Sequence, residues 1–296
     1  MRLKNLALKD KGIFVKYLNL TPHRLSVYNF NNIYIWKGLF EIKWAIIENN
    51  LCLFFEDKIG AFLYLTPLGM NRNINVIKEV FSILDKINKN KPVSRIENIE
   101  QQDLAVYERG GYKISKKSDD YVYRRSDLAN FKGNKFKSQR AGFNYFSKNY
   151  KFQYLPLSPK DRQGCLELYG CWMDERKSRN PDHTYQGMLT DSRNSLTIAL
   201  KNYTDLDFSG RIVKINHKIR GFTIGFRLNN HTFCILYEIT DLAIKGLSQF
   251  IFRQFCRELS AYEYINVMDD SGLENLKKVK LAYHPAELVP AYIAKR

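Results

Sequence analysis

Residues 211–239 of this chain read RIVKINHKIRGFTIGFRLNNHTFCILYEI. Three runs in this stretch are rich in β-branched and aromatic residues and favour strands, namely 211–216, 219–228 and 232–239. The runs are separated by His217-Lys218 and by Asn229-Asn230, which suit tight turns. The stretch therefore predicts three antiparallel strands that follow one another as a meander.

A helix and a β-α-β unit are predicted to follow this meander. Leu247, Phe250, Ile251 and Phe255 recur at helical spacing and favour a helix over 245–259. The later elements are a strand at 262–268, a helix at 271–282 and a strand at 288–294. A meander, a helix entered through a glycine-containing loop and then β-α-β is the order of the GNAT acyltransferase core.

The same order occurs in the first half of the chain, so we predict an internal repeat. Its predicted elements are strands at 43–48, 51–56 and 61–66, a helix at 75–88, a strand at 94–99, a helix at 101–109 and a strand at 112–124. Helices at 135–149, 160–176 and 191–202 and a strand at 152–157 precede the second meander. We predict an α+β protein of two tandem GNAT-like domains, 1–128 and 129–296, each a mixed, mostly antiparallel sheet flanked by helices, with the active site in the second.

Composition limits where the protein works and what it binds. The chain has 296 residues, which suits two domains of about 150 residues each. No run of about 18 apolar residues is present, and five cysteines without a CxxC pair suit a reducing compartment. We expect a cytoplasmic protein, with peripheral contact to the inner face of the membrane left open. The net charge of +17 favours a polyanionic partner, either tRNA or another polyanion such as an anionic membrane surface.

The cations gather between residues 129 and 160, where seven Lys or Arg occur and no Asp or Glu. Aromatic residues alternate with them, namely Phe131, Phe136, Phe143, Tyr145, Phe146 and Tyr150. This pattern is typical of a surface that neutralises phosphates and stacks on bases. It also fits an amphipathic helix whose aromatic residues point inward and whose cations stay in water.

Two segments resemble a bacterial family, that of the C-terminal domain of phosphatidylglycerol lysyltransferase. The first segment contributes Asp127, Leu128, Lys132, Gly133, Asn134, Lys135, Phe136, Arg140, Asn144 and Phe146. The second contributes Asn266, Asp270, Gly272, Leu276, Lys278, Lys280, Leu281, Tyr283 and Pro285. Residues 26–36, SVYNFNNIYIW, and 220–225, RGFTIG, also look familiar, so the resemblance spans nearly the whole chain.

The resemblance implies a tandem GNAT fold related to the Fem-type aminoacyltransferases, which take an amino acid from aminoacyl-tRNA. It implies no bound cofactor and an amine or hydroxyl acceptor such as a lipid headgroup, a peptidoglycan precursor or a small molecule. Substrate- and phosphate-binding candidates in the two segments are Lys135, Lys137, Arg140, Asn144, Asn266, Asp270, Lys278 and Lys280.

The chain departs from the family pattern at several of these positions. Lys137, Gln139 and Ala141 stand where the family has His, Lys and Asn, and Val267-Met268 replaces an Arg-Glu pair. Two alternatives to aminoacyl transfer therefore stay open. One is an acyl-CoA-dependent N-acyltransferase, and the other is a GNAT-fold module that binds nucleic acid or anionic lipid without turnover.

GNAT chemistry needs a base for the attacking amine and an acid for the leaving group, and no covalent enzyme intermediate. Glu238 on the third strand of the second meander is the candidate base, although a solvent-exposed or Arg-paired carboxylate is the ordinary alternative. Tyr283, after the last helix, is the candidate acid, or else a packed side chain. The five His residues show no metal-ligand spacing, so we expect no metal.

The donor's phosphates are expected at the start of the helix near residue 245, because a helix N-terminus offers unpaired N–H groups. The candidate donor-binding residues there are Lys245, Gly246, Leu247, Ser248 and Gln249. This stretch lacks the full glycine-rich loop of acetyl-CoA enzymes, which disfavours coenzyme A. The ordinary alternative is that Gly246 only opens the helix.

Overall fold

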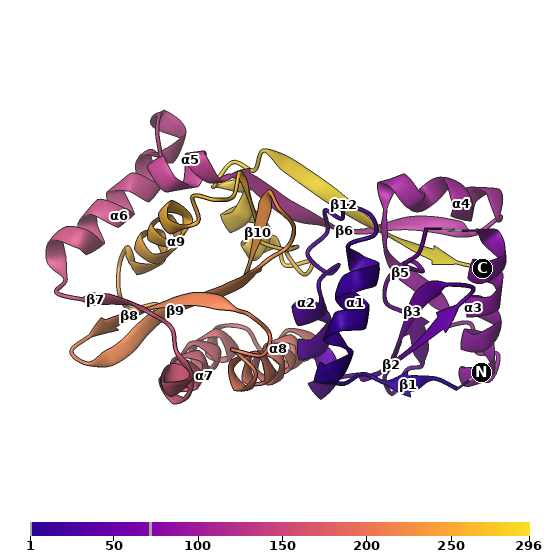
Figure 1. The fold of residues 1–296 in the computed structure, drawn as a ribbon. Coiled ribbons are helices and arrows are strands. Elements are labelled where there is room, and N and C mark those ends of the chain that lie inside the picture. Colours follow the sequence, from indigo (N-terminus) through magenta and orange to yellow (C-terminus); the bar gives the residue numbers. More distant parts are fainter. Residues whose placement is uncertain (1, 71–72) are drawn as a thin grey trace. The chain divides into compact units, whose positions relative to one another are not determined.

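A computed structural model describes residues 2–70 and 73–296 of the chain (Figure 1). The chain forms two compact units. Unit 1 comprises Met1–Asp120, Asp269–Gly272 and Leu288–Arg296, and unit 2 comprises Tyr121–Met268 and Leu273–Glu287. Each unit is a mixed, mostly antiparallel sheet flanked by helices, as predicted.

The sheet of unit 1 has the strand order β1-β2-β3-β4-β5-β12. Its strands are β1 (Lys4–Asn5), β2 (Glu41–Ile47), β3 (Asn50–Glu56), β4 (Ala61–Leu63), β5 (Arg95–Glu100) and β12 (Glu287–Lys295). Its helices are α1 (Lys11–Leu18), α2 (Phe30–Tyr34), α3 (Ile74–Ile87) and α4 (Leu104–Arg109). Helix α3 begins after Asn73, whose side chain accepts hydrogen bonds from the amides of Asn75 and Val76, and buries Val80, Phe81 and Leu84 in the core of this unit.

The sheet of unit 2 has the strand order β6-β11-β10-β9-β8-β7. Its strands are β6 (Lys113–Arg124), β7 (Gln153–Pro156), β8 (Ser209–Ile215), β9 (Lys218–Arg227), β10 (Thr232–Thr240) and β11 (Tyr264–Asn266). Its helices are α5 (Arg125–Asn130), α6 (Lys137–Asn149), α7 (Arg162–Arg179), α8 (His183–Lys201), α9 (Leu247–Glu258) and α10 (Glu274–Leu281). Strands β8, β9 and β10 are the meander of residues 211–239.

The turn between β8 and β9 lies one residue earlier than predicted. Its central residues are Asn216 and His217, with φ of 50° and 61°. A two-residue turn with positive φ at both positions matches the twist of the strands it joins, and Asn tolerates that conformation well. Pairing then starts directly between Ile215 and Lys218.

The division of the chain differs from the predicted boundary at residue 128. Strand β12, expected to complete the second domain, instead pairs antiparallel with β5 of unit 1, with Ala291 opposite Glu100. Strand β6 belongs to both units. Its residues up to Asp120 are part of unit 1, and its residues from Tyr121 on are part of unit 2. Such long-range pairing leaves no local sequence signal.

Several short elements were not predicted from the sequence, namely β1, α1, α2 and α5. Helix α5 is six residues long and ends at Phe131, which has the left-handed φ of 51°. Within residues 2–70 and 73–296, no helix is both long enough and apolar enough to cross a membrane.

Candidate functional site

Strands β10 and β11 pair over only three residues. Thr232, Phe233 and Cys234 of β10 lie opposite Tyr264–Asn266 in parallel, and β11 then ends. From Ile235 to Thr240, β10 has β9 as its one strand partner among the described residues. This stretch of β10 therefore presents a strand edge on the side where β11 has stopped pairing, and such an edge carries backbone N–H and C=O groups.

A β-bulge in β10 decides which side chains face each side of the sheet. The register with β9 shifts between Ile235 and Tyr237, so Leu236 is an extra residue. Tyr237 faces α8, where its hydroxyl contacts the Ser195 hydroxyl at 2.5 Å and donates to the Ser192 carbonyl at 3.0 Å. A one-residue shift turns every later side chain to the other face, so the bulge directs Glu238 to the opposite side of the sheet, toward α9.

Glu238 carries a carboxyl group that no charge among the described residues compensates. Its Oε2 atom is buried and has no hydrogen-bond partner among the described residues, although the residue as a whole is half-buried. Burial raises the pKa of Glu238 to about 8. The expected alternative of an Arg-paired carboxylate is therefore not what the structure shows.

Tyr283 lies close enough to Glu238 for the two to interact electrostatically. Its pKa is raised by burial first and then by the charge of Glu238. Its ring packs edge-on against Phe252, with ring centroids 5.0 Å apart. The structure thus brings together the two predicted catalytic residues, and Tyr283 is at the same time a packed side chain. Burial, and after it the charge of Glu238, raises the pKa of the Cys256 thiol on α9.

Four of the five predicted donor-binding residues line a groove of about 510 Å³ at the start of α9. Its wall includes Lys245 and Gly246, which precede α9, Ser248 and Gln249 of α9, and Ser138, Ala141, Gly142 and Tyr145 of α6. Among the described residues, no acceptor takes a hydrogen bond from the amides of Ser248 and Gln249. We name this the donor groove. The side chain of Leu247 is buried in the core and does not line it.

Gly246 is required by its backbone and by its surroundings. Its φ is +84°, and a Cβ at this position would lie 2.1 Å from the carbonyl oxygen of Gly142. The backbone of α6 therefore comes into direct contact with the start of α9, and Figure 1 shows the two helices side by side. Gly246 does more than open a helix.

Some predicted phosphate-binding residues of the basic segment interact with other protein groups, and others are exposed without such an interaction being central to them. Arg140 donates from Nη1 to the carbonyls of Phe131 and Gly133. Lys135 is exposed and pairs with Asp127 at 3.3 Å. Lys137 and Asn144 are exposed on α6.

Half of the six aromatic residues in the basic segment are not available to stack on bases. Phe131, Phe136 and Phe146 are fully buried in the core of unit 2, which favours the alternative of inward-pointing aromatic residues for these three. Tyr145 is exposed, and the Nζ of Lys245 lies 4.7 Å above its ring. Helix α6 of this segment is thus amphipathic, with the cations Lys137 and Lys148 exposed to solvent.

The candidates of the second segment differ in their engagement. Asn266 is fully buried, and its Oδ1 accepts a hydrogen bond from the amide of Met268 at 2.7 Å. Lys280 donates to the carbonyls of Val267 and Met268 at 2.5 and 3.1 Å. Asp270, in unit 1, accepts from the amide of Gly272 at 3.0 Å. Lys278 is exposed on α10.

Two functional candidates were missed in the sequence, Arg253 and Arg257 of α9. They follow Gln249 at intervals of four residues, so all three lie on one face of the helix, about 12 Å from first to last. Both guanidinium groups donate to the carbonyl of Ala129 at the end of α5. Their spacing was visible, but the sequence does not show that α5 ends beside them.

These arginines form a cluster with Arg140, and no carboxylate among the described residues pairs with any of the three. Burial and the charges of Arg257 and Arg140 lower the pKa of Arg253. The guanidinium of Arg253 lies 4.3 Å from the ring centre of Phe143, which Arg257 also covers. Lys245 at the donor groove, Arg253 and Arg257 make a cationic track along α9, and Arg140 of α6 lies beside it.

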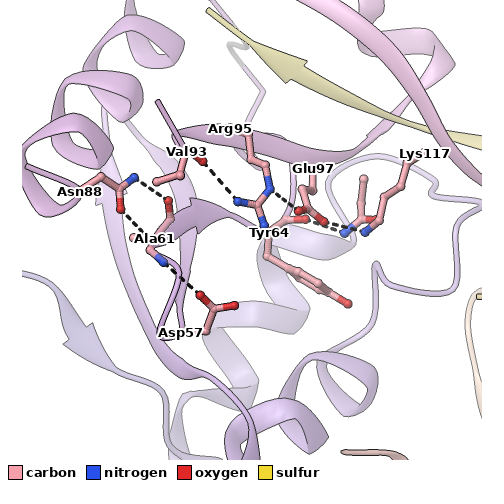
Figure 2. A network of polar contacts seen from close by, with 10 residues as sticks. Asp57, Ala61, Tyr64, Asn88, Val93, Arg95, Glu97 and Lys117 are labelled. Atoms are coloured by element: carbon pink, nitrogen blue, oxygen red, sulfur yellow. Dashed lines mark hydrogen bonds and ion pairs between the residues drawn. The ribbon is translucent and has the colours of Figure 1, made fainter. Parts of the chain in front are cut away.

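In the described part of unit 1, the corresponding strands β4 and β5 leave no comparable opening. Strand β4 pairs with β5 at Leu63 and Ile96, and the Asn98 side chain then donates to the carbonyl of Tyr64 at 2.8 Å. The Nζ of Lys117 donates to the Oδ1 of Asn98 at 2.9 Å and to the Oε2 of Glu97 at 2.7 Å. Figure 2 shows Glu97 held by Arg95 and Lys117, with Tyr64 beside them. Polar side chains therefore bridge the position that stays unpaired in unit 2.

In the described ranges, no three His, Cys, Asp or Glu side chains lie together in a way that suits a metal ion.

Residues 18–295 match the family model described as phosphatidylglycerol lysyltransferase, C-terminal. A conserved protein of unknown function from Bacteroides thetaiotaomicron is 28% identical, with a TM-score of 0.88, and the match covers 100% of this chain and 99% of that one. No curated protein sequence matches.

Two more distant structures share the fold. L-PGS from Bacillus licheniformis is 18% identical with a TM-score of 0.64, over 97% of this chain and 92% of that one. FemX is 10% identical with a TM-score of 0.61, over 99% and 97%. The predicted tandem GNAT fold is confirmed.

Proposed function

The chain belongs to the family of the phosphatidylglycerol lysyltransferase C-terminal domain, and we propose that it transfers an amino acid from aminoacyl-tRNA to an amine or hydroxyl acceptor. The cationic track carries the proposal. It starts at the donor groove with Lys245, passes Gln249 and continues to Arg253 and Arg257. A polyanion longer than one nucleotide can use the groove and the track together.

The donor groove suits the terminal phosphate of such a donor. It combines the open amides of Ser248 and Gln249, the positive end of the α9 dipole and the ammonium group of Lys245. The track then offers guanidinium groups that no carboxylate in the described part of the chain neutralises, so they keep their charge for phosphates. These features support a nucleic-acid donor.

The reaction follows from the groups beside the free edge of β10. The acceptor amine attacks the ester carbonyl, a C–N bond forms, and the C–O bond to the tRNA ribose breaks. Ionised Glu238 takes a proton from the amine, while Tyr283 gives one to the leaving ribose oxygen. Exchange with solvent then removes the proton from Glu238 and returns one to Tyr283, which restores both groups. Amides on the edge of β10 can stabilise the developing oxyanion.

Filter binding with a mixture of charged tRNAs tests the donor. We expect binding at low ionic strength that weakens steeply as salt is added, because phosphate contacts release counterions. Transfer is then measured as loss of labelled amino acid from tRNA in the presence of candidate acceptors. No salt-sensitive binding of charged tRNA would contradict the proposal.

An acyl-CoA donor is the second candidate, because the donor groove at the start of α9 also suits a pyrophosphate. Coenzyme A would fill the groove and leave Arg253 and Arg257 unused. A thermal-shift comparison separates the two donors. Stabilisation by acetyl-CoA and none by tRNA would favour the CoA-dependent reaction.

A binding module without turnover is the third candidate, because apolar Val267 stands at the end of β11 and packs against the core. In that case Glu238→Gln and Tyr283→Phe would leave cellular function intact, and charge reversal at Lys135 and Arg140 would abolish it. Peripheral contact with anionic lipid is tested by sedimentation with vesicles of phosphatidylglycerol.

A further inference from the structure

A second groove of about 510 Å³ lies in unit 2, away from the start of α9. One wall is a face of α7 that carries Glu167, Trp172 and Glu175. The other wall is the hairpin of β8 and β9, which carries His217 and Lys218. We name it the hairpin groove.

Close packing sets the shape of the hairpin groove. Gly164 of α7 lies against Ile219, and a Cβ on Gly164 would come within 2.9 Å of the Cδ1 atom of Ile219. The absence of a side chain at Gly164 lets the hairpin approach the helix here. The groove is thus formed by two regular elements, which hold its walls in place.

The walls of the hairpin groove are balanced in charge, unlike the chain as a whole. Its lining includes four Lys or Arg, four Asp or Glu and one His, in a chain of net charge +17. Four of these charged residues form two ion pairs. Lys214 pairs with Asp161 at 3.0 Å, and Arg220 pairs with Asp241 at 2.9 Å. Glu167 on α7 and Lys218 on the hairpin are exposed and have no ion-pair partner among the described residues.

This balance selects the chemistry of a ligand. A polyanion gains from the cations but is repelled by the carboxylates, and a polycation has the reverse difficulty. A zwitterion satisfies both walls, with its ammonium group toward Glu167 and its carboxylate toward Lys218. Half-buried Trp172 adds an apolar surface for the body of the ligand.

The hairpin groove adjoins the donor groove, because Asp241 and Leu242 line both. Both residues lie in the segment that joins β10 to α9, directly after the strand that carries Glu238. The two grooves are therefore placed as neighbouring sites of one transfer reaction.

We propose that the hairpin groove binds the acceptor, and that the acceptor is a short zwitterionic peptide. The inference rests on the proposed function, which it deepens by naming the class of acceptor. A peptide with a second amine, as on a lysine side chain, has one ammonium group to be held and another amine to be acylated.

Isothermal titration of the full chain with L-alanyl-L-lysine tests the proposal. We expect binding that weakens at least tenfold when the probe's N-terminus is acetylated, and at least tenfold when its C-terminus is amidated. Glu167→Gln and Lys218→Gln should each weaken binding to a similar degree. Both side chains are exposed, so the fold should persist, and an unchanged melting temperature checks this.

Matched controls are Glu263→Gln and Lys201→Gln, two exposed residues of unit 2 that line neither groove. They should bind the probe as the unmodified chain does. Equal binding of the blocked probes, or equal loss in the control variants, would overturn the proposal.

A second measurement separates this inference from the proposed function. Charged tRNA that binds while the dipeptide does not would overturn the hairpin-groove site and leave the donor proposal standing. Dipeptide binding with the expected variant effects but without tRNA binding would leave the site standing and remove the donor. Vesicle binding without dipeptide binding would overturn the peptide acceptor.

Discussion

Gly246 and Gly142 meet backbone to backbone, so that a Cβ on Gly246 would lie 2.1 Å from the carbonyl oxygen of Gly142. The φ of Gly246 is +84°, a conformation that L-residues adopt at a cost of about 1 to 2 kcal/mol. We predict that Gly246→Ala lowers the free energy of unfolding by about 2 kcal/mol or more, measured by urea denaturation.

The matched control for Gly246→Ala is Gly170→Ala in α7. No atom lies within 4 Å of the Cβ that Gly170 would gain, and the residue is in a helix interior. Alanine should therefore stabilise the chain by about 0.5 to 1 kcal/mol. Equal effects of the two variants would contradict the close contact between α6 and α9.

The pKa of Glu238, raised by burial to about 8, predicts how transfer depends on pH. The base is active when ionised, so the rate should rise with pH and level off above about 8. Glu238→Gln should lower the rate about 10² to 10⁴-fold and remove this rise, while binding of charged tRNA stays unchanged. A rate profile that is the same in both proteins would exclude Glu238 as the base.

The same raised pKa predicts a stability difference with a definite sign. The folded chain binds the Glu238 proton more tightly than the unfolded chain, so this group stabilises the fold at low pH. The stabilisation is lost as pH rises from about 4.5 to 8. Glu238→Gln should therefore gain stability relative to the unmodified chain between pH 6 and pH 9, by about 1 kcal/mol or more. Urea denaturation at both pH values measures this.

The sequence predicted regular elements well where periodicity is strong, and it failed where long-range pairing decides. The meander and helix α9 were predicted nearly residue by residue, because turn residues and apolar spacing mark them locally. The strand at 288–294 was placed in the second domain, since nothing near Ala291 shows that it pairs with Glu100 of unit 1.

The candidate site was predicted for similar reasons. Glu238 and Tyr283 were chosen as catalytic candidates from strand position and family resemblance, and their roles stay predictions. That Glu238 faces α9 depends on the bulge at Leu236, which the sequence does not show. Arg253 was missed because its role depends on the end of α5 at Ala129, which lies far away in the chain.

The cationic track predicts how tRNA binding responds to substitution. Arg257→Gln should weaken binding of charged tRNA and reduce the slope of log affinity against log salt by about 0.7 to 0.9, because one phosphate contact is lost. Lys201→Gln on α8 removes the same charge away from the track and should leave the slope unchanged. Filter binding from 50 to 200 mM salt measures both. Equal slopes for all three proteins would contradict the track.

Helix α10 offers a comparison between two lysines that the sequence treats alike. Lys280 donates to the carbonyls of Val267 and Met268, whereas Lys278, two residues earlier, is exposed. Lys280→Met removes a charged donor from two half-buried carbonyls and should cost about 1 to 3 kcal/mol in the free energy of unfolding. Lys278→Met should change it by less than about 0.5 kcal/mol.

The carbonyls that accept hydrogen bonds from Lys280 directly follow β11, so the loss of Lys280 should also increase hydrogen exchange at Val267 and Met268. A stable Lys280→Met variant with unchanged exchange would show that Lys280 does not hold the end of this strand, and would leave it available as the predicted phosphate ligand.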